Sequence, residues 1–191
     1  MHSLDFPIDV DYDMPPALDV LIAACHPHLQ VRDDSESDSL FYPMNFSLTT
    51  LLKLSNYPIL EAVRNSLFPT LPDRHYLQTV HDKLDVLPTG ASIDIQVLAS
   101  DSCVATVIVT LPVRYRGGAF MVHPPESGEE NFQGRGGKSR HMKWIVYLSD
   151  CAAEVELVQK GCHITLSYVV HLKNFSPAGI VPDPLIMPND S

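Results

Sequence analysis

Apolar residues follow two different periods along the chain, and the change falls near Gly90. Before this point they recur every three or four residues, in short runs that begin or end at prolines. Such spacing is typical of amphipathic helices, and proline is well tolerated at the first helical position. The pattern therefore predicts helices over residues 17–24, 47–54, 58–68 and 72–87.

After Gly90 the period becomes two. Ile93, Ile95 and Val97 alternate with polar residues, as in a strand with one apolar face. Similar or more continuous apolar runs predict further strands over residues 104–111, 119–123, 142–148, 154–158 and 163–172. Residues 114–118 and Lys160-Gly161 are interpreted as turns, and the glycine-rich segment 124–139 as a long loop.

Helices followed by six or seven short strands indicate an α+β domain. A β-sandwich or jelly roll with helices packed on one outer face fits this order best. We expect one domain over residues 1–191. Its parts are a helical buttress over 1–90, a β core over 91–172 and a proline-rich tail over 173–191.

The composition limits the classes of partner that the chain is expected to bind. The 191 residues include 13 basic and 23 acidic side chains, a formal net charge of −10, which argues against binding to a phosphate backbone. No apolar run is long enough to span a bilayer, and the acidic start does not resemble a signal peptide. We therefore expect a cytoplasmic protein with no nucleic-acid or membrane partner. None of the four cysteines forms a C-x-x-C pair, so reduced thiols are expected rather than a zinc site.

One stretch carries a family resemblance. It contains the run TVIVTLP, then Gly117-Gly118, and then KW-x-x-Y-x-SDC-x-x-EV with a later G-x-x-x-T-L-x-Y. The pattern covers residues 92–172 and resembles the fungal branch of the Fe(II)/2-oxoglutarate oxygenases, which are similar to prolyl 4-hydroxylases. The resemblance implies a double-stranded β-helix, or jelly roll, with the N-terminal helices packed on the larger sheet.

The resemblance also implies an iron site that this sequence does not reproduce. The family pattern has an H-x-D pair between Leu98 and Val104, where only Asp101 remains as a candidate. Ala153 stands at the position of the distal histidine ligand. His163 stands at the position of the arginine that grips 2-oxoglutarate. We therefore expect no cofactor, with Fe(II) and 2-oxoglutarate as the alternative.

Strand alternation indicates which side chains would line the barrel. If His163 points inward, then Thr165 and Ser167 point inward with it, and Ile164, Leu166 and Tyr168 face the helices. A histidine in this place is a candidate general acid or base. The candidate catalytic residues are His163, Asp150 and Asp101. The candidate substrate-binding residues are Thr165, Ser167, His123 and Tyr147, and no metal ligand is assigned.

Three functions are consistent with these observations. The first is a barrel without iron that performs non-redox acid–base chemistry on a small molecule, as an isomerase, cyclase or dehydratase, in a setting such as fungal natural-product biosynthesis. The second is a non-catalytic pseudoenzyme that binds a small ligand or a protein partner. The third is an oxygenase with a remodelled metal site built from Asp101, Asp150 and either His123 or His163. The first is preferred, and the other two stay open.

Overall fold

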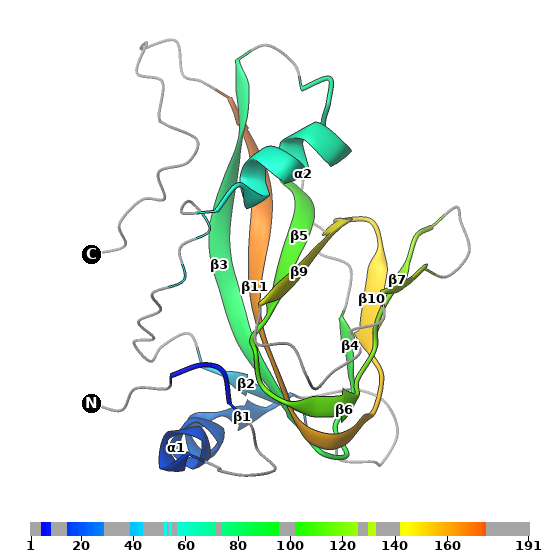
Figure 1. Ribbon diagram of the computed structural model, residues 1–191. Coiled ribbons are helices and arrows are strands. Elements are labelled where there is room, and N and C mark those ends of the chain that lie inside the picture. The colour runs from blue at the N-terminus through cyan, green and yellow to red at the C-terminus, as the bar shows by residue number, and fades with distance from the viewer. Residues whose placement is uncertain are drawn as a thin grey trace.

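Two antiparallel β-sheets make up most of the structure, and two helices lie outside the larger sheet (Figure 1). The computed structural model describes residues 5–8, 15–28, 39–43, 52, 54, 57–71, 74–95, 102–125, 130–132 and 142–174. Within this part of the chain, neither helix is long and apolar enough to cross a membrane.

From β3 to β11 the chain passes back and forth between the two sheets. The larger sheet has the order β1-β2-β3-β11-β5-β9. Its strands are β1 (His26–Pro27), β2 (Leu40–Tyr42), β3 (His75–Pro88), β5 (Cys103–Thr110), β9 (Lys143–Leu148) and β11 (Val158–Asn174), and β6 (Tyr115–Gly117) pairs with the start of β11. The smaller sheet has the order β4-β10-β7-β8, with β4 (Ile93–Ile95), β7 (Phe120–His123), β8 (Glu130–Phe132) and β10 (Ala152–Val155). This topology is a double-stranded β-helix, as the sequence predicted.

Helix α1 begins at Pro16, whose fixed φ suits a first turn, and Pro58 is the N-cap residue of α2. Helix α1 spans Pro16–Ala24 and α2 spans Ile59–Leu67, which confirms the predicted helices over 17–24 and 58–68. The helix predicted over 47–54 lies outside the described residues, except for Leu52 and Leu54.

The helix predicted over residues 72–87 is wrong, because this segment is the long strand β3. Tyr76, Val80 and Leu84 are spaced by four, as on one face of a helix, but in the strand an irregular pairing puts Leu84 on the opposite face from the other two. Pairing decides the outcome, since β3 runs antiparallel to β11 along nearly its whole length. The region 1–90 is therefore not a purely helical buttress, because it also contributes β1, β2 and β3.

Two predicted turns are parts of strands. Residues 115–117 form β6, and Lys160-Gly161 lies inside β11, where the pairing with β6 is irregular. Gly161 has φ +85°, and a Cβ there would collide with the carbonyl oxygen of Arg114. Only glycine fits this bend, which carries β11 from β6 to its long pairings with β3 and β5. Part of the predicted loop 124–139 is strand β8.

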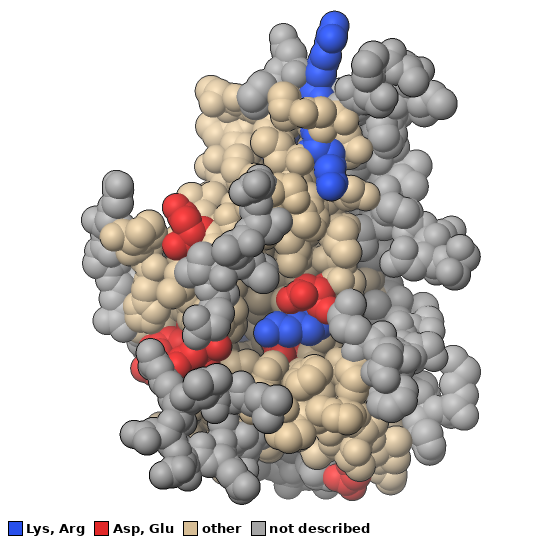
Figure 2. All heavy atoms as spheres, turned by 180° about the vertical axis from the view of Figure 1, so that it is seen from behind, with Lys and Arg blue, Asp and Glu red and all other residues tan. Residues whose placement is uncertain are grey.

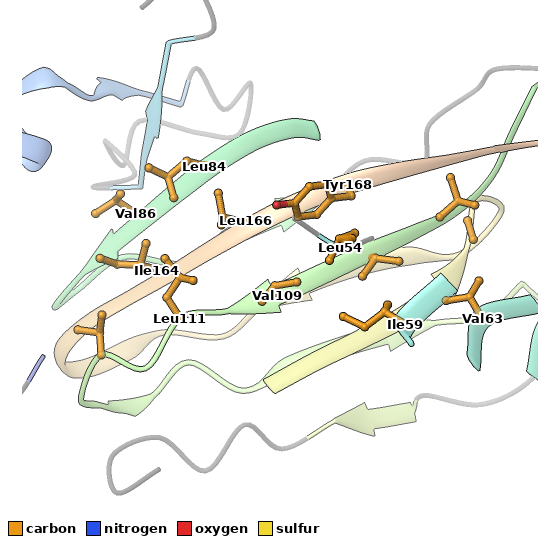
Figure 3. Close-up of a cluster of buried hydrophobic side chains, with 14 of the residues drawn as sticks. Leu54, Ile59, Val63, Leu84, Val86, Val109, Leu111, Ile164, Leu166 and Tyr168 are labelled. Carbon is orange, nitrogen blue, oxygen red and sulfur yellow. The ribbon is translucent and has the colours of Figure 1, made fainter. Parts of the chain in front are cut away.

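Two apolar clusters lie on opposite faces of the larger sheet. On the outer face, Ile164, Leu166 and Tyr168 pack in one cluster with Ile59 of α2 (Figure 3). Leu18 of α1 belongs to the same cluster. This confirms the predicted orientation of the three β11 residues. The other cluster lies between the sheets and includes Leu87, Ile93, Ile108, Tyr115, Phe120, Val122, Tyr147, Ala153, Val155 and Val158.

Candidate functional site

A polar row crosses the inner face of the larger sheet. His163, Thr165 and Ser167 of β11 are each at most 4% exposed. In the antiparallel pairing with β3, Thr165 lies opposite Asp85 and Ser167 opposite Lys83. Side chains directly opposite each other in such a pair lie on the same face of the sheet. Strand β3 therefore adds two charged side chains to the polar row.

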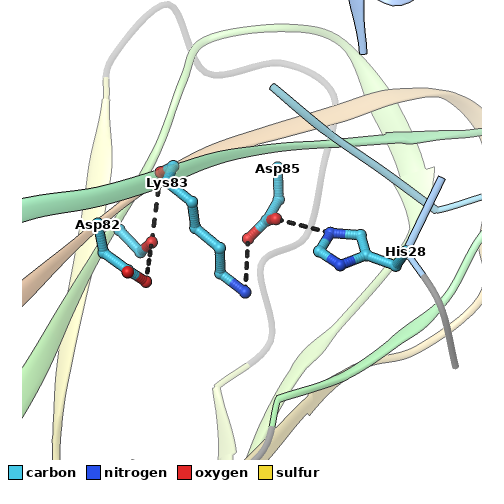
Figure 4. A network of polar contacts seen from close by, with 5 residues as sticks. His28, Asp82, Lys83 and Asp85 are labelled. Carbon is cyan, nitrogen blue, oxygen red and sulfur yellow. Dashed lines mark hydrogen bonds and ion pairs between the residues drawn. The ribbon is translucent and has the colours of Figure 1, made fainter. Parts of the chain in front are cut away.

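These charged groups form a connected network near the N-terminal segment (Figure 4). His28 Nε2 lies 2.9 Å from Asp85 Oδ1, and Lys83 Nζ lies 3.6 Å from Asp85 Oδ2. Only 5% of the Asp85 side chain is exposed, so its charge needs such partners. His28 and Lys83 are 18% and 28% exposed, which makes this network the border between the interior and solvent.

A β-bulge adds a second carboxylate. Ser167 pairs with Lys83 and Tyr168 pairs with His81, so Asp82 is the extra residue on β3. The Ser167 hydroxyl donates to Asp82 Oδ2 at 3.2 Å, which brings this carboxylate to the inner face.

Figure 2 shows basic and acidic side chains close together in a hollow in the middle of one face of the molecule.

His163 lies deeper, without hydrogen-bond partners. Its ring stacks on that of Tyr115, with centroids 4.2 Å apart and planes at 16°. Neither ring nitrogen has a partner within the described part of the chain. Burial lowers the pKa of His163 to about 4, although the Asp85 carboxylate acts in the opposite direction. At neutral pH the ring is therefore uncharged, with one donor and one acceptor nitrogen.

Tyr147 belongs to the same interior. It is 7% exposed, and its ring packs against Phe120 at a centroid distance of 5.9 Å. Burial raises the pKa of its hydroxyl, a hydrogen bond with Thr106 acts in the opposite direction, and the negative charges of Asp82 and Asp85 add to the rise. The charges of these two carboxylates therefore reach Tyr147, which lies in the apolar cluster between the sheets.

The structure separates two further sequence candidates, Asp150 and His123, from this interior. Asp150 is exposed on the turn after β9, where the Cys151 thiol contacts its Oδ1 at 3.6 Å. His123 alternates with the inward-facing Val122, so it lies on the outside of the smaller sheet, 3.5 Å from Glu154. Asp101 lies outside the described residues. Of the six candidates that the structure describes, the interior therefore holds His163, Thr165, Ser167 and Tyr147.

Sequence reasoning missed the charged half of the site. Lys83 and Asp85 alternate with Leu84 and Val86, which is a strand signal, but the predicted helix obscured it. His28 has no such signal, since 57 residues separate it from its partner Asp85.

The resemblance assigns Ala153 and His163 to two positions of a cofactor site, and neither residue fits Fe(II) and 2-oxoglutarate there. Ala153 on β10 offers a methyl group, packed in the apolar cluster between the sheets. The uncharged His163 cannot pair with a carboxylate as an arginine does. Among the described residues, no three His, Cys, Asp or Glu side chains are grouped closely enough to hold a metal ion.

No protein-family model matches the sequence, and no curated protein matches it. Among solved structures, the chain is similar to an oxidoreductase of the 2OG-Fe(II) oxygenase family from Burkholderia pseudomallei. The identity is 17% and the TM-score 0.50, over 82% of this chain and 77% of that one. It is also similar to a prolyl-4-hydroxylase from Pseudomonas putida, at 18% identity and a TM-score of 0.39, over 58% of each chain. A cupin from Bacteroides fragilis aligns at 13% identity and a TM-score of 0.27, over 56% of this chain and 79% of that one.

The match to the Burkholderia protein shows that the two chains share a fold. An identity of 17% is too low to show that they share a function. The topology and this match define the class of the fold as a double-stranded β-helix, which the chain shares with the Burkholderia protein. The aligned part spans little more than half of the hydroxylase's own length.

Proposed function

We propose that this protein binds a small molecule between its two sheets and performs non-redox acid–base chemistry on it, without Fe(II) or 2-oxoglutarate. The observation that carries the proposal is the charged network of His28, Asp82, Lys83 and Asp85 at the border of the interior. Buried ionisable groups that face a concave interior are typical of ligand-binding and catalytic sites.

The pair of His28 and Asp85 is the best candidate for proton transfer. A buried carboxylate that accepts a hydrogen bond from one ring nitrogen fixes the orientation of a histidine. His28 is partly exposed, so a ligand at the border can reach it. His163 is the weaker base, because burial holds its pKa near 4. Its role in the proposal is to hydrogen-bond the ligand, together with Thr165 and Ser167.

Independence from iron is supported by the residues at the family's cofactor positions. Ala153 has no donor atom, and the neutral His163 replaces a permanent positive charge. Reactions that need only proton transfer and shape, such as isomerisation, cyclisation or dehydration, suit the side chains that are present.

The test begins with a library of metabolite-sized molecules screened by ligand-observed NMR in the presence of a chelator. The proposal expects at least one molecule to bind to the native chain and to lose binding in Asp85→Asn. It should keep binding in Glu154→Gln, which alters a matched carboxylate–histidine pair on the outer surface.

A bound molecule is then incubated in D₂O, and deuterium entering at carbon is followed by NMR. Exchange that is lost in His28→Ala and kept in His26→Ala supports acid–base chemistry. Binding without any proton transfer would indicate a non-catalytic binding protein. A library in which nothing binds would overturn the proposal itself.

A further inference from the structure

The two carboxylates at the border of the interior have different partners. Asp85 contacts His28 and the Lys83 ammonium group, whereas Asp82, also on the inner face of β3, contacts an uncharged group. The ammonium lies 3.6 Å from Asp85, while the contact of Asp82 is the neutral hydroxyl of Ser167. An ionised carboxylate can accept several hydrogen bonds, so both groups retain acceptor capacity. This inner face therefore favours a positive ligand group.

A second observation points to a ligand in the same place. His163 is 1% exposed, and neither of its ring nitrogens has a partner within the described residues. Buried polar atoms are nearly always paired, so an unpaired one requires an explanation. His163 lies two residues from Thr165, which is opposite Asp85, and the Asp85 charge acts on the ring. Such diagonal neighbours are separated by about 7–8 Å, a span that one small molecule can bridge.

We propose that the ligand of this interior is a small organic amine that also carries a hydroxyl or carbonyl group. Its ammonium group binds between Asp82 and Asp85, and its uncharged polar group pairs with the ring of His163. This ligand class rests on the proposed small-molecule function and narrows it. A dicarboxylate such as 2-oxoglutarate would instead meet two negative charges on β3 and an uncharged ring on β11.

Three probes of the same length isolate the charge. They are 4-amino-1-butanol, 1,4-butanediol and 4-hydroxybutanoate, each titrated into the full chain by calorimetry or NMR at neutral pH. The amine should bind about tenfold or more tightly than either of the others, and a tenfold ratio corresponds to about 1.4 kcal/mol. In Asp85→Asn this preference should fall to about one, and in Glu154→Gln it should be unchanged.

Asp82→Asn provides a second variant in case Asp85→Asn does not fold, because the Asp82 carboxylate is less buried. It should also reduce the preference for the amine. Stronger binding of the diol or the acid would overturn the ligand class and leave the small-molecule proposal standing. If no probe binds although library molecules do, the ligand class is likewise wrong. If neither probes nor library molecules bind, both proposals fail.

Discussion

Replacing His163 with leucine should stabilise the ligand-free protein, although it removes a buried aromatic contact. The side chain is 1% exposed and both ring nitrogens lack partners within the described residues. Burying one unsatisfied polar group costs about 1–3 kcal/mol. The stacking on Tyr115 contributes about 0.5–1.5 kcal/mol, which the variant loses. The net expectation at pH 7 is a gain of about 1 kcal/mol, or roughly 2–4 °C in Tm for a chain of this size.

The dependence of the unfolding free energy on pH tests this account more sharply than the change in Tm does. The pKa of His163 is about 4 in the folded chain and 6.5 for an ordinary histidine. The unfolded chain therefore binds a proton that the folded chain does not, so stability is full above pH 6.5 and falls as the pH drops towards 4. Between pH 7 and pH 5 the linkage amounts to a loss of about 2 kcal/mol. His163→Leu should lack this loss.

The assay is urea unfolding of the native chain and the variant at several pH values between 5 and 7.5. The quantity compared is the difference between the two slopes of unfolding free energy against pH, since His81 also has a lowered pKa and contributes to both. Identical slopes would refute the account of His163 as a buried, uncharged ring. So would an NMR titration in which the native His163 gains its proton near pH 6.5.

Two further predictions concern the scaffold. Gly161→Ala should destabilise the chain by at least about 2–3 kcal/mol in chemical unfolding, because it combines a φ of +85° with a collision against the Arg114 carbonyl. Gly90→Ala, at a position with a φ of +93°, should cost about 1 kcal/mol, and an equal loss at the two sites would contradict the packing argument. Ile164→Ala should cost about 2–5 kcal/mol, because this side chain is fully buried in the outer cluster. Val80→Ala, at a position that is 45% exposed, should stay within about 0.5 kcal/mol of the native chain in the same measurement.

The sequence predicted the half of the site that lies on β11. Its period of two separates His163, Thr165 and Ser167 from Ile164, Leu166 and Tyr168, and the structure places the two sets on opposite faces. That inference works because one face of the strand packs against apolar helices, which fixes its register.

The other half depends on contacts between distant segments. The pairing with Thr165 puts Asp85 on the inner face of the sheet. Its hydrogen-bond partner His28 lies 57 residues earlier in the sequence. Asp82 reaches the interior because of a bulge, which has no signature in the local pattern of apolar residues. The local sequence also does not tell which face His123 occupies. Its place on the outside of the smaller sheet depends on the register between β7 and β10.

The central claim is that this double-stranded β-helix holds a small molecule without Fe(II) or 2-oxoglutarate. The most direct test is a titration of Fe(II) and 2-oxoglutarate into the full chain under nitrogen, with metal content and Tm measured together. The account predicts no stoichiometric iron and no rise in Tm with 2-oxoglutarate, while 4-amino-1-butanol raises Tm in the native chain and not in Asp85→Asn. One equivalent of bound iron, with a further rise in Tm on adding 2-oxoglutarate, would contradict it.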